Sequence, residues 1–233
     1  MIKVEQAAKM FGSKIALDDL SFSVEAGQIV GLVGANGAGK STMLKAMAGL
    51  LHLDRGKITI DGKSPCRSTR ERLAFLPDLD AWYPWMKLSD IMRYMQDLYP
   101  DWDGKKADHL LDYLHLKRDS LIKVASKGTR AKIKLLLVLS RQAKYLLLDE
   151  PFSGIDPFAR EQIAHAIMED FLEEEQTILI ATHEVSEVEA LLDEILFLDD
   201  GKLLLKGNVE TLKLAESKSL LEILKEVYHH ARL

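Results

Sequence analysis

One stretch of the sequence constrains the fold more than any other. Residues 34–41 read Gly-Ala-Asn-Gly-Ala-Gly-Lys-Ser and fit the pattern G-x-x-x-x-G-K-[S/T] without a gap. The apolar run at 28–33 before them indicates a buried strand, and the spacing of apolar residues in 41–51 after them indicates a helix. A glycine-rich loop in this position can turn its backbone N–H groups around a phosphate, and the helix adds the positive end of its dipole. The sequence therefore predicts a site for the phosphates of a nucleotide.

Two acidic residues follow a second apolar strand farther along the chain. The run 145–148 indicates a buried strand, and Asp149 and Glu150 come directly after it. Because such a strand ends at the carboxyl edge of the sheet, both carboxylates are expected beside the glycine loop. Lys40 then supplies a charge for the β- and γ-phosphates, while Ser41 and Asp149 supply oxygens for Mg²⁺. Glu150 is placed to orient or deprotonate a water, so the two motifs together predict a nucleoside triphosphatase.

Composition narrows the class of partner. The 233 residues include 36 acidic and 31 basic ones, and the formal net charge is −5. Nucleic-acid-binding proteins usually carry an excess of Lys and Arg, so this balance disfavours that class. The single cysteine, Cys66, excludes an intramolecular disulfide. No apolar run approaches the roughly 20 residues of a transmembrane helix, and a connection to a membrane is therefore expected to run through a partner.

Strands and helices alternate along the sequence, which favours an α/β fold with a parallel sheet. The stretch 78–124 differs, because it carries all three tryptophans and two of the predicted helices. We interpret 1–233 as one domain, in which 1–77 and 125–208 form the nucleotide-binding core, 78–124 a helical subdomain and 209–233 a helical tail. Strands are expected over 2–7, 15–24, 28–33, 57–60, 73–76, 145–148, 177–181, 194–198 and 202–205, and helices over 41–51, 88–98, 105–116, 128–143, 157–174 and 184–192.

Further features surround the two motifs. Phe11 lies upstream, in a loop that the first two expected strands flank. Ser126 and Gly128 belong to the sequence Ala-Ser-Lys-Gly-Thr before the acidic strand, residues 153–156 (Ser-Gly-Ile-Asp) follow the acidic pair, and His183 ends the next strand. Taken singly, these are more often a packing Phe, a helix N-cap and a helix-start or core histidine. In this order, the set resembles the ATP-binding cassette (ABC) ATPases over nearly the whole chain.

The resemblance implies a P-loop nucleoside triphosphatase core with an N-terminal antiparallel β region and a helical insert, and it implies ATP and Mg²⁺ as cofactors. It implies that Phe11 stacks on adenine, that Glu150 is the catalytic base, and that His183 contacts the γ-phosphate and the attacking water. Ser126 and Gly128 would close over the ATP held by a second subunit. The residues expected to bind ATP are Phe11, Gly34, Ala35, Asn36, Gly37, Ala38, Gly39, Lys40, Ser41, Thr42, Ser126 and Gly128.

The resemblance also implies partners and a place in the cell. The chain would be the ATP-hydrolysing subunit that powers a membrane transporter through ATP-driven dimerisation, as a homodimer or as a heterodimer with another ABC ATPase. Residues 153–156 would communicate between the two subunits. Separately encoded permease subunits would hold the chain in the cytoplasm at the inner face of the cell membrane, and no nucleic acid partner is expected.

The Ser-Lys-Gly version of the motif at 126–128 and the lack of a large C-terminal regulatory domain favour export. Two alternatives remain open, namely a soluble ABC-type ATPase that acts on nucleic acid or ribosomes and a regulatory nucleotide switch with slow turnover. The transported substrate is not predicted, because it would contact the membrane subunits.

Two features leave their roles open. Asp78 stands where the family usually has glutamine, and an ionised carboxylate accepts hydrogen bonds but does not donate them. It either adds an oxygen ligand to Mg²⁺ or lies away from the metal and only ties the helical insert to the core. Trp82, Tyr83 and Trp85 fall within four positions of the sequence, around Pro84. They form either a docking patch for a membrane subunit, since Trp and Tyr are favoured at interface centres, or a small core of the insert itself.

Overall fold

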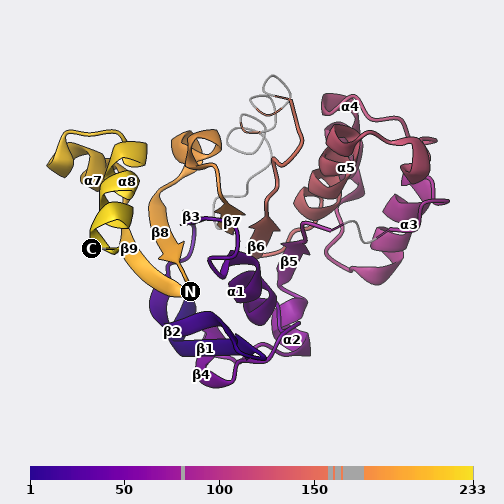
Figure 1. The fold of residues 1–233 in the computed structure, drawn as a ribbon. Helices are drawn as coiled ribbons and strands as arrows, with labels where there is room; N and C mark the ends of the chain where they lie inside the picture. The colour runs from indigo at the N-terminus through magenta and orange to yellow at the C-terminus, as the bar shows by residue number, and fades with distance from the viewer. Residues whose placement is uncertain (80–81, 157–159, 161–163, 165–175, 233) are drawn as a thin grey trace.

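The fold contains two β-sheets (Figure 1), and the computed structural model describes residues 1–79, 82–156, 160, 164 and 176–232. A three-stranded antiparallel sheet has the order β2-β1-β4, and a six-stranded sheet has the order β5-β6-β7-β3-β8-β9. All neighbours in the larger sheet are parallel except β8 and β9. The predicted α/β class with an antiparallel N-terminal region is confirmed. The helix expected over 157–174 lies almost entirely outside the described residues.

All nine predicted strands are present, in the predicted order. The strands are β1 Ile2–Phe11, β2 Lys14–Val24, β3 Ile29–Val33, β4 Arg55–Ile60, β5 Leu73–Leu76, β6 Tyr145–Asp149, β7 Thr177–Thr182, β8 Glu194–Asp199 and β9 Lys202–Asn208. The helices are α1 Lys40–Met47, α2 Arg67–Arg70, α3 Leu88–Leu98, α4 Gly104–Tyr113, α5 Lys127–Leu139, α7 Val209–Glu216 and α8 Leu220–His230, with 3₁₀ turns η1 Ile122–Val124, η2 Val185–Glu187 and η3 Glu189–Leu191. Among these described elements, no helix has the length and apolar character that a membrane span requires.

Three parallel strands end side by side and define one edge of the larger sheet. β3 pairs with β7, and β7 pairs with β6. Their last residues are in register, because Val33 lies opposite Thr182 and Asp149 lies opposite Ala181. The residues that follow these strands therefore meet at the carboxyl edge of the sheet, which is where ligands bind in α/β folds of this kind.

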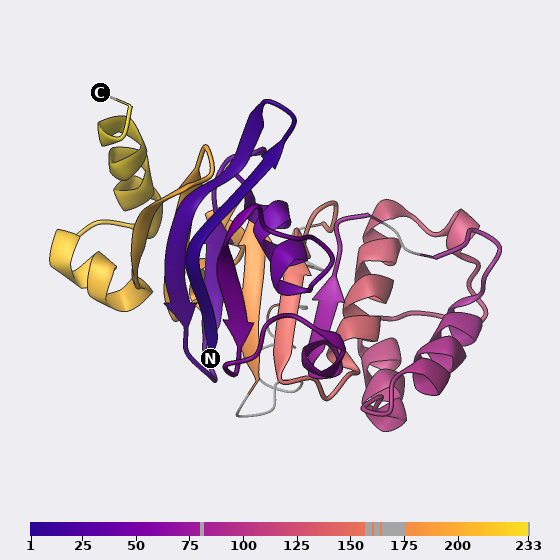
Figure 2. The ribbon, with the colours of Figure 1, turned by 90° about the horizontal axis from the view of Figure 1, so that it is seen from below.

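The larger sheet separates two apolar cores. Leu147 of β6 and Leu179 of β7 pack on the side of α1 and the antiparallel sheet. Leu146, Leu148 and Ile178 pack on the opposite side, in the core that includes α3, α4 and α5. Successive residues of a strand point to opposite faces of the sheet. Because an apolar core covers each face of the larger sheet, these strands are continuously apolar. α1 contacts strands of both sheets (Figure 2).

Helices α3, α4 and α5 lie at one end of the molecule, and α7 and α8 lie at the other (Figures 1 and 2). Arg141, just after α5, joins the helical end to β5. Its buried guanidinium donates to Asp101 over distances of 2.8 to 3.2 Å and to the carbonyl oxygens of Glu71 and Leu73, both at 3.1 Å. It also stacks 3.9 Å from the centre of the Tyr99 ring. One arginine thus satisfies several acceptors that are far apart in sequence.

Phe11 does not lie in a loop, contrary to expectation. It is the last residue of β1 and pairs with Lys14 of β2. Only Gly12 and Ser13 separate the two strands, and Gly12 has a φ of 59°. A two-residue turn with positive φ matches the twist of the paired strands, so the hairpin continues almost to its tip.

The helix predicted over 184–192 was wrong. This segment instead forms the two 3₁₀ turns η2 and η3, separated by Val188, whose φ is −124°. Val185, Val188 and Leu191 are buried and recur every third residue. A 3₁₀ helix has three residues per turn and places such residues on one line, whereas an α-helix would spread them around its axis. The apolar spacing therefore favours the tighter turns.

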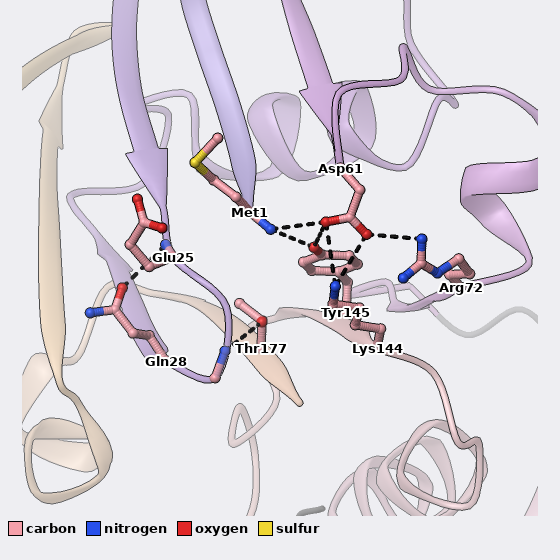
Figure 3. A network of polar contacts seen from close by, with 9 residues as sticks. Met1, Glu25, Gln28, Asp61, Arg72, Lys144, Tyr145 and Thr177 are labelled. Carbon is pink, nitrogen blue, oxygen red and sulfur yellow. Dashed lines mark hydrogen bonds and ion pairs between the residues drawn. The ribbon is translucent and has the colours of Figure 1, made fainter. Parts of the chain in front are cut away.

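A polar cluster fixes the beginning of β6 (Figure 3). The Tyr145 hydroxyl donates to Oδ1 of Asp61 over 2.6 Å and accepts from the N-terminal ammonium of Met1 over 2.7 Å. Arg72 and Lys144 lie 2.9 and 3.3 Å from the other Asp61 oxygen. Burial alone would raise the pKa of Asp61, but the hydrogen bonds from Tyr145, the N-terminus and Lys144 outweigh it and hold this pKa far below its usual range.

Candidate nucleotide-binding site

The loop between β3 and α1 closes around the ammonium group of its own lysine. Lys40 is buried, and its Nζ donates to the carbonyl oxygens of Gly34 and Ala35 over 2.7 and 3.2 Å. Gly39 has a φ of 105°, and a Cβ at this position would lie 2.4 Å from the carbonyl oxygen of Ala16 in β2. Only glycine fits both the backbone conformation and this contact. The close approach of β2 therefore sets the path of the loop.

Lys40 also faces an acidic residue across the site. Its Nζ lies 3.6 Å from Oε1 of Glu150. Burial lowers the pKa of Lys40, whereas the charges of Glu150 and Asp149 act in the opposite direction. A buried ammonium is tolerated when it is paired and hydrogen-bonded, and both conditions are met here. The positive charge is thus held where the sequence motif predicts the phosphates.

Ser41 and Asp149 form a pair of oxygen donors. The Ser41 hydroxyl donates to Oδ1 of Asp149 over 2.9 Å. Burial raises the pKa of Asp149, the hydrogen bond from Ser41 lowers it, and the charges of Asp78 and Glu150 raise it further. A hydroxyl beside a carboxylate suits Mg²⁺, which prefers oxygen ligands and is usually held by one or two carboxylates together with substrate phosphates and water. The described residues contain no cluster of three or more His, Cys, Asp and Glu placed to hold a metal ion.

Glu150 and His183 face each other at the same edge. Nδ1 of His183 lies 3.0 Å from both carboxylate oxygens of Glu150. Glu150 has a φ of 49°, which is uncommon for a residue with a side chain, and its N–H donates to the carbonyl oxygen of Ala181 over 2.8 Å. This bond to the adjacent strand stabilises the strained backbone that directs the carboxylate toward Lys40 and His183.

A cavity of about 250 Å³ joins the phosphate loop to the N-terminal hairpin. Phe11 and Asp78 both line this cavity together with residues of the loop. The predicted contact of Phe11 with adenine needs this position, and so does the alternative in which Asp78 is a ligand of Mg²⁺. Gly34, Ala35 and Ala38 belong to the loop without lining the cavity. The lining residues are Phe11, Lys14, Ala16, Asn36, Gly37, Gly39, Lys40, Ser41, Thr42, Asp78 and Glu150.

Ser126 and Gly128 do not line this cavity. Ser126 is exposed and caps α5, because its Oγ accepts from the N–H of Thr129 over 3.1 Å. Gly128 lies against the segment 153–156, since a Cβ on Gly128 would be 3.3 Å from the carbonyl oxygen of Gly154. The structure thus places Gly128 beside 153–156, and both Ser126 and Gly128 outside the lining of the phosphate cavity of their own chain.

Two lysines of the site were missed by the sequence analysis. Lys14 lines the phosphate cavity, and its ammonium lies 3.8 Å from where a Cβ on Gly37 would be. The Phe-Gly-Ser-Lys spacing, which permits a two-residue turn, was the signal that places Lys14 opposite Phe11. Lys134 of α5 donates to the carbonyl oxygens of Asp78 and Pro77 over 2.6 and 3.3 Å. No local pattern predicts a bond to a carbonyl so distant in sequence.

A phosphate loop between a parallel strand and a helix, with a lysine inside it and a carboxylate at the end of a nearby strand, defines a P-loop nucleoside triphosphatase. Comparison with known proteins assigns the chain to one family within this class. A family model described as ABC transporter matches residues 17–153, and the chain belongs to that family as one of its ATPase cassettes.

Individual relatives and a solved structure agree with this assignment. The lipopolysaccharide export system ATP-binding protein LptB of Haemophilus influenzae is 31% identical, with 90% of this chain and 91% of that protein covered. A probable sulfate/thiosulfate import ATP-binding protein CysA of Chlorella vulgaris is also 31% identical, with 91% and 92% covered. A solved structure described as the ATP binding subunit of an ABC transporter has a TM-score of 0.86, is 26% identical, and covers 98% of this chain and 99% of its own. Similarity therefore extends to relatives named for opposite directions of transport.

Proposed function

We propose that this chain binds ATP with Mg²⁺ and hydrolyses it to power a membrane transporter, as one of two ATPase subunits held at the cytoplasmic face of the membrane by separate permease subunits. The observation that carries this proposal is the contact of Glu150 with both Lys40 and His183. A carboxylate, an ammonium and an imidazole meet at the edge where the phosphate loop begins. The arrangement supplies a phosphate-binding charge and a proton acceptor within one small site.

Binding begins with groups that the chain already holds in place. Phe11 is half exposed at the end of β1 and offers a ring face to an adenine, as proposed from the family pattern. Lys40 is positioned to exchange its bonds to loop carbonyls for bonds to phosphate oxygens, and the N–H groups of the loop and of the start of α1 add further donors. Ser41 and Asp149 would hold Mg²⁺, which neutralises phosphate charge when bound.

Glu150 would act on the attacking water. Its carboxylate is mostly buried, lies 3.6 Å from Lys40 and accepts from or pairs with the His183 ring at 3.0 Å. A carboxylate held from two sides is oriented before the water arrives, so little reorganisation is needed to accept its proton or to align it with the γ-phosphate. His183 would contact the γ-phosphate from the opposite side of that water.

A second copy of the cassette would complete the site. Ser126 caps helix α5 and is exposed, and Gly128, two residues later, lies against the segment 153–156. The beginning of a helix attracts anions, and one that faces away from its own phosphate cavity is available to a phosphate presented by another chain. We therefore propose that two copies enclose ATP between Ser41 of one and Ser126 of the other.

A permease would dock on the helical end. An apolar cavity of about 440 Å³ lies where α1, the end of β5, α3 and α5 meet, and Phe75, Leu79, Trp82 and Tyr99 help to line it. Beside it, Tyr83 and Trp85 stack with their ring centres 5.6 Å apart and remain exposed. Apolar lining with exposed aromatic rings fits a helix presented by a membrane protein. Export is the direction that we propose, on the Ser-Lys-Gly sequence at 126–128.

The proposal is tested with Glu150→Gln in the full chain. This variant is expected to bind ATP but not to hydrolyse it, and so to accumulate as a dimer in gel filtration with ATP and Mg²⁺, because a ligand bound only by the closed dimer stabilises that dimer. Adding Ser126→Arg is expected to abolish the dimer while leaving ATP affinity of the monomer unchanged. A chain that remains monomeric at saturating ATP, alone and with a co-expressed permease, would contradict the shared site.

The same preparations separate the alternatives. Wild-type ATP turnover together with recovery in the membrane fraction only when a permease is co-expressed supports the transporter subunit. Turnover with ribosomes or nucleic acid but without a membrane partner would favour the ABC-type ATPase that acts on them. ATP binding without turnover under any of these conditions would favour the regulatory switch.

A further inference from the structure

A second cavity adjoins the phosphate cavity. Its volume is about 500 Å³, and it shares two lining residues, Asp78 and Glu150, with the phosphate cavity. The two cavities therefore meet at the carboxylate proposed to act on the attacking water, and none of the steps of binding and hydrolysis described above uses the second one. Its lining residues are Asp78, Leu79, Ala125, Lys127, Arg130, Ala131, Lys134, Glu150 and Ser153.

Three basic side chains line one side of this second cavity. Lys127, Arg130 and Lys134 are separated by three and four positions in α5, so they lie on one face of the helix. The acidic residues of the lining are Asp78 and Glu150, the two that also line the phosphate cavity. The lining that the two cavities do not share therefore carries only positive charge.

Contacts within the protein hold these cations in place. The side chain of Lys127 lies against Gly154, where a Cβ would be 2.6 Å from Cδ of the lysine, so the glycine leaves the space that the lysine occupies. Nε of Arg130 donates to the carbonyl oxygen of Ala125 over 3.1 Å. Lys134 donates to two carbonyl oxygens, as described above. Because these acceptors are neutral, the bonds hold the side chains without cancelling their charge.

The position of the second cavity suits the product of hydrolysis. Phe11 and the phosphate loop line only the first cavity, where they would still hold ADP after the reaction. Inorganic phosphate would form beside Glu150, at the boundary between the two cavities. Lysine and arginine bind phosphate oxygens through charge-assisted hydrogen bonds. With ADP on one side of this boundary, the adjoining space on the other side offers the cations of α5.

We propose that the second cavity binds the inorganic phosphate released from ATP, through Lys127 and Arg130, before the phosphate leaves the protein. This inference rests on the proposed function and adds a site for one of its products. The beginning of α5 is also the part of the chain proposed to meet the ATP of a second copy. A phosphate of that ATP is therefore the alternative ligand, and the experiment separates the two sources.

Phosphate binding is measured by NMR of the backbone amides in the full chain, with ADP and Mg²⁺ present and no ATP. ADP then occupies the phosphate loop, and no second ATP is available. Inorganic phosphate is added at constant ionic strength to wild type and to Lys127→Gln/Arg130→Gln. The matched control is Lys132→Gln, which removes the same charge from the same helix but does not line the cavity. Lys134 is left intact because it bonds the carbonyl oxygen of Asp78.

In wild type, the amide signals of residues 125–134 are expected to shift and to saturate with phosphate. Lys127→Gln/Arg130→Gln is expected to raise the dissociation constant of phosphate at least about tenfold, since two charge-assisted contacts are lost. In steady-state ATPase, inhibition by added phosphate should weaken by the same factor, with KM for ATP unchanged. Lys132→Gln is expected to match wild type in both measurements.

Equal phosphate affinity in wild type and Lys127→Gln/Arg130→Gln would overturn the proposal. An equal loss in Lys132→Gln would also overturn it, because the effect would then come from the overall charge of α5. The two substitutions are also added to Glu150→Gln: loss of the ATP-dependent dimer with unchanged phosphate binding would assign these side chains to the ATP of the second copy.

If wild type does not turn over ATP, the proposed function fails, and the NMR titration still decides whether this cavity is a phosphate site. Should the double variant not fold, Lys127→Gln and Arg130→Gln carry the same comparison singly, each with a smaller expected loss.

Discussion

Ser41 donates a hydrogen bond to Asp149 over 2.9 Å and joins two residues that are 108 positions apart. The bond connects the first turn of α1, which follows the phosphate loop, to Asp149, the last residue of β6 and the first of the acidic pair. It assembles the two oxygen ligands proposed for Mg²⁺ within the protein itself. Preassembly of this kind lowers the ordering cost of binding a ligand.

Asp149→Asn is expected to stabilise the nucleotide-free chain at pH 7. Burial raises the pKa of Asp149, so its effect on stability is favourable below the unfolded-state pKa and is lost as the pH rises through the folded-state value. At pH 7 the buried charge therefore opposes folding, and asparagine removes it while still accepting from Ser41. We expect Tm to rise by about 2–4 °C in thermal unfolding, the shift that about 1 kcal/mol produces in a chain of this size. The stabilisation by Mg²⁺ and ATP should fall in the same variant, and a lower Tm without ligand would contradict the prediction.

Lys40→Ala is expected to weaken ATP binding by about ten- to hundredfold, or about 1.5–3 kcal/mol, because a charge-assisted contact to phosphate is lost. Titration calorimetry on the folded variant measures this. The control is Lys57→Ala in β4. Lys57 is exposed, and its ion pair with Glu5 lies away from the phosphate loop. Unchanged ATP affinity in Lys40→Ala would exclude this lysine as a phosphate ligand.

Asp61→Asn is expected to destabilise the chain at pH 7 and to destabilise it less at pH 2. The cluster around Tyr145 lowers the pKa of Asp61, so its contribution is present above the unfolded-state pKa and disappears as the pH falls toward the folded-state value. We expect a loss of about 1–2 kcal/mol at pH 7 in denaturant unfolding, reduced by water screening of the partly exposed carboxylate. Asp119→Asn, at an exposed position with one long surface pair, is the control. An equal loss at both pH values would show that the charge of Asp61 is unimportant.

Trp82→Ala and Trp85→Ala are expected to differ. Trp82 is partly buried and meets Tyr94 edge to face at 6.3 Å, whereas Trp85 is 70% exposed and stacks on the exposed Tyr83. Trp82→Ala should lower the stability of the isolated chain by about 2–3 kcal/mol, and Trp85→Ala by less than about 0.5 kcal/mol. Trp85→Ala should nevertheless weaken capture of a co-expressed permease by about 2 kcal/mol or more. Full retention of the permease by both variants would show that this cluster is not a docking surface.

Asp78 is expected to make turnover of the isolated chain slow. It lines the phosphate cavity, but its ionised carboxylate offers no hydrogen to the water or to a phosphate. Asp78→Gln should raise kcat about two- to tenfold, since a single gained hydrogen bond is worth about 0.5–1.5 kcal/mol, while Asp78→Ala should stay near wild type. Steady-state ATPase across a Mg²⁺ titration measures both variants. A fast wild type that loses activity in both would make Asp78 a metal-site residue, and three equal rates would leave it without a catalytic role.

The sequence predicted those parts of the site that depend on short stretches of chain. The phosphate loop and the acidic pair are each continuous, and parallel strands bring their carboxyl ends together, so the meeting of Lys40 with Glu150 followed from topology. The order of the motifs also predicted the family. The roles assigned to Phe11, Ser126, Gly128 and His183 stay predictions, as do the limits of the helical subdomain.

What the sequence did not predict depends on contacts between distant segments. Lys134 reaches the carbonyl of Asp78 and Arg160 reaches Glu187, and neither partner is marked by a local pattern. The 3₁₀ turns after His183 were taken for one α-helix because a spacing of three between apolar residues is also part of the α-helical pattern, although its repetition at Val185, Val188 and Leu191 fits the tighter turns. The length of β1 was underestimated because the turn after Phe11 is only two residues long.

The hydrogen bond of Tyr145 at the beginning of β6 affects where Asp149 lies at the end of the same strand. Because both faces of this strand are apolar, a slip by one residue would still bury leucines and would change the apolar pattern little. The same slip would turn Asp149 away from Ser41 and toward the wrong side of the sheet. Tyr145 lies on the same face as Asp149, and its hydroxyl finds Asp61 in only one alignment. A hydrogen bond at the far edge of the sheet thus sets the alignment that places the carboxylate proposed to bind Mg²⁺.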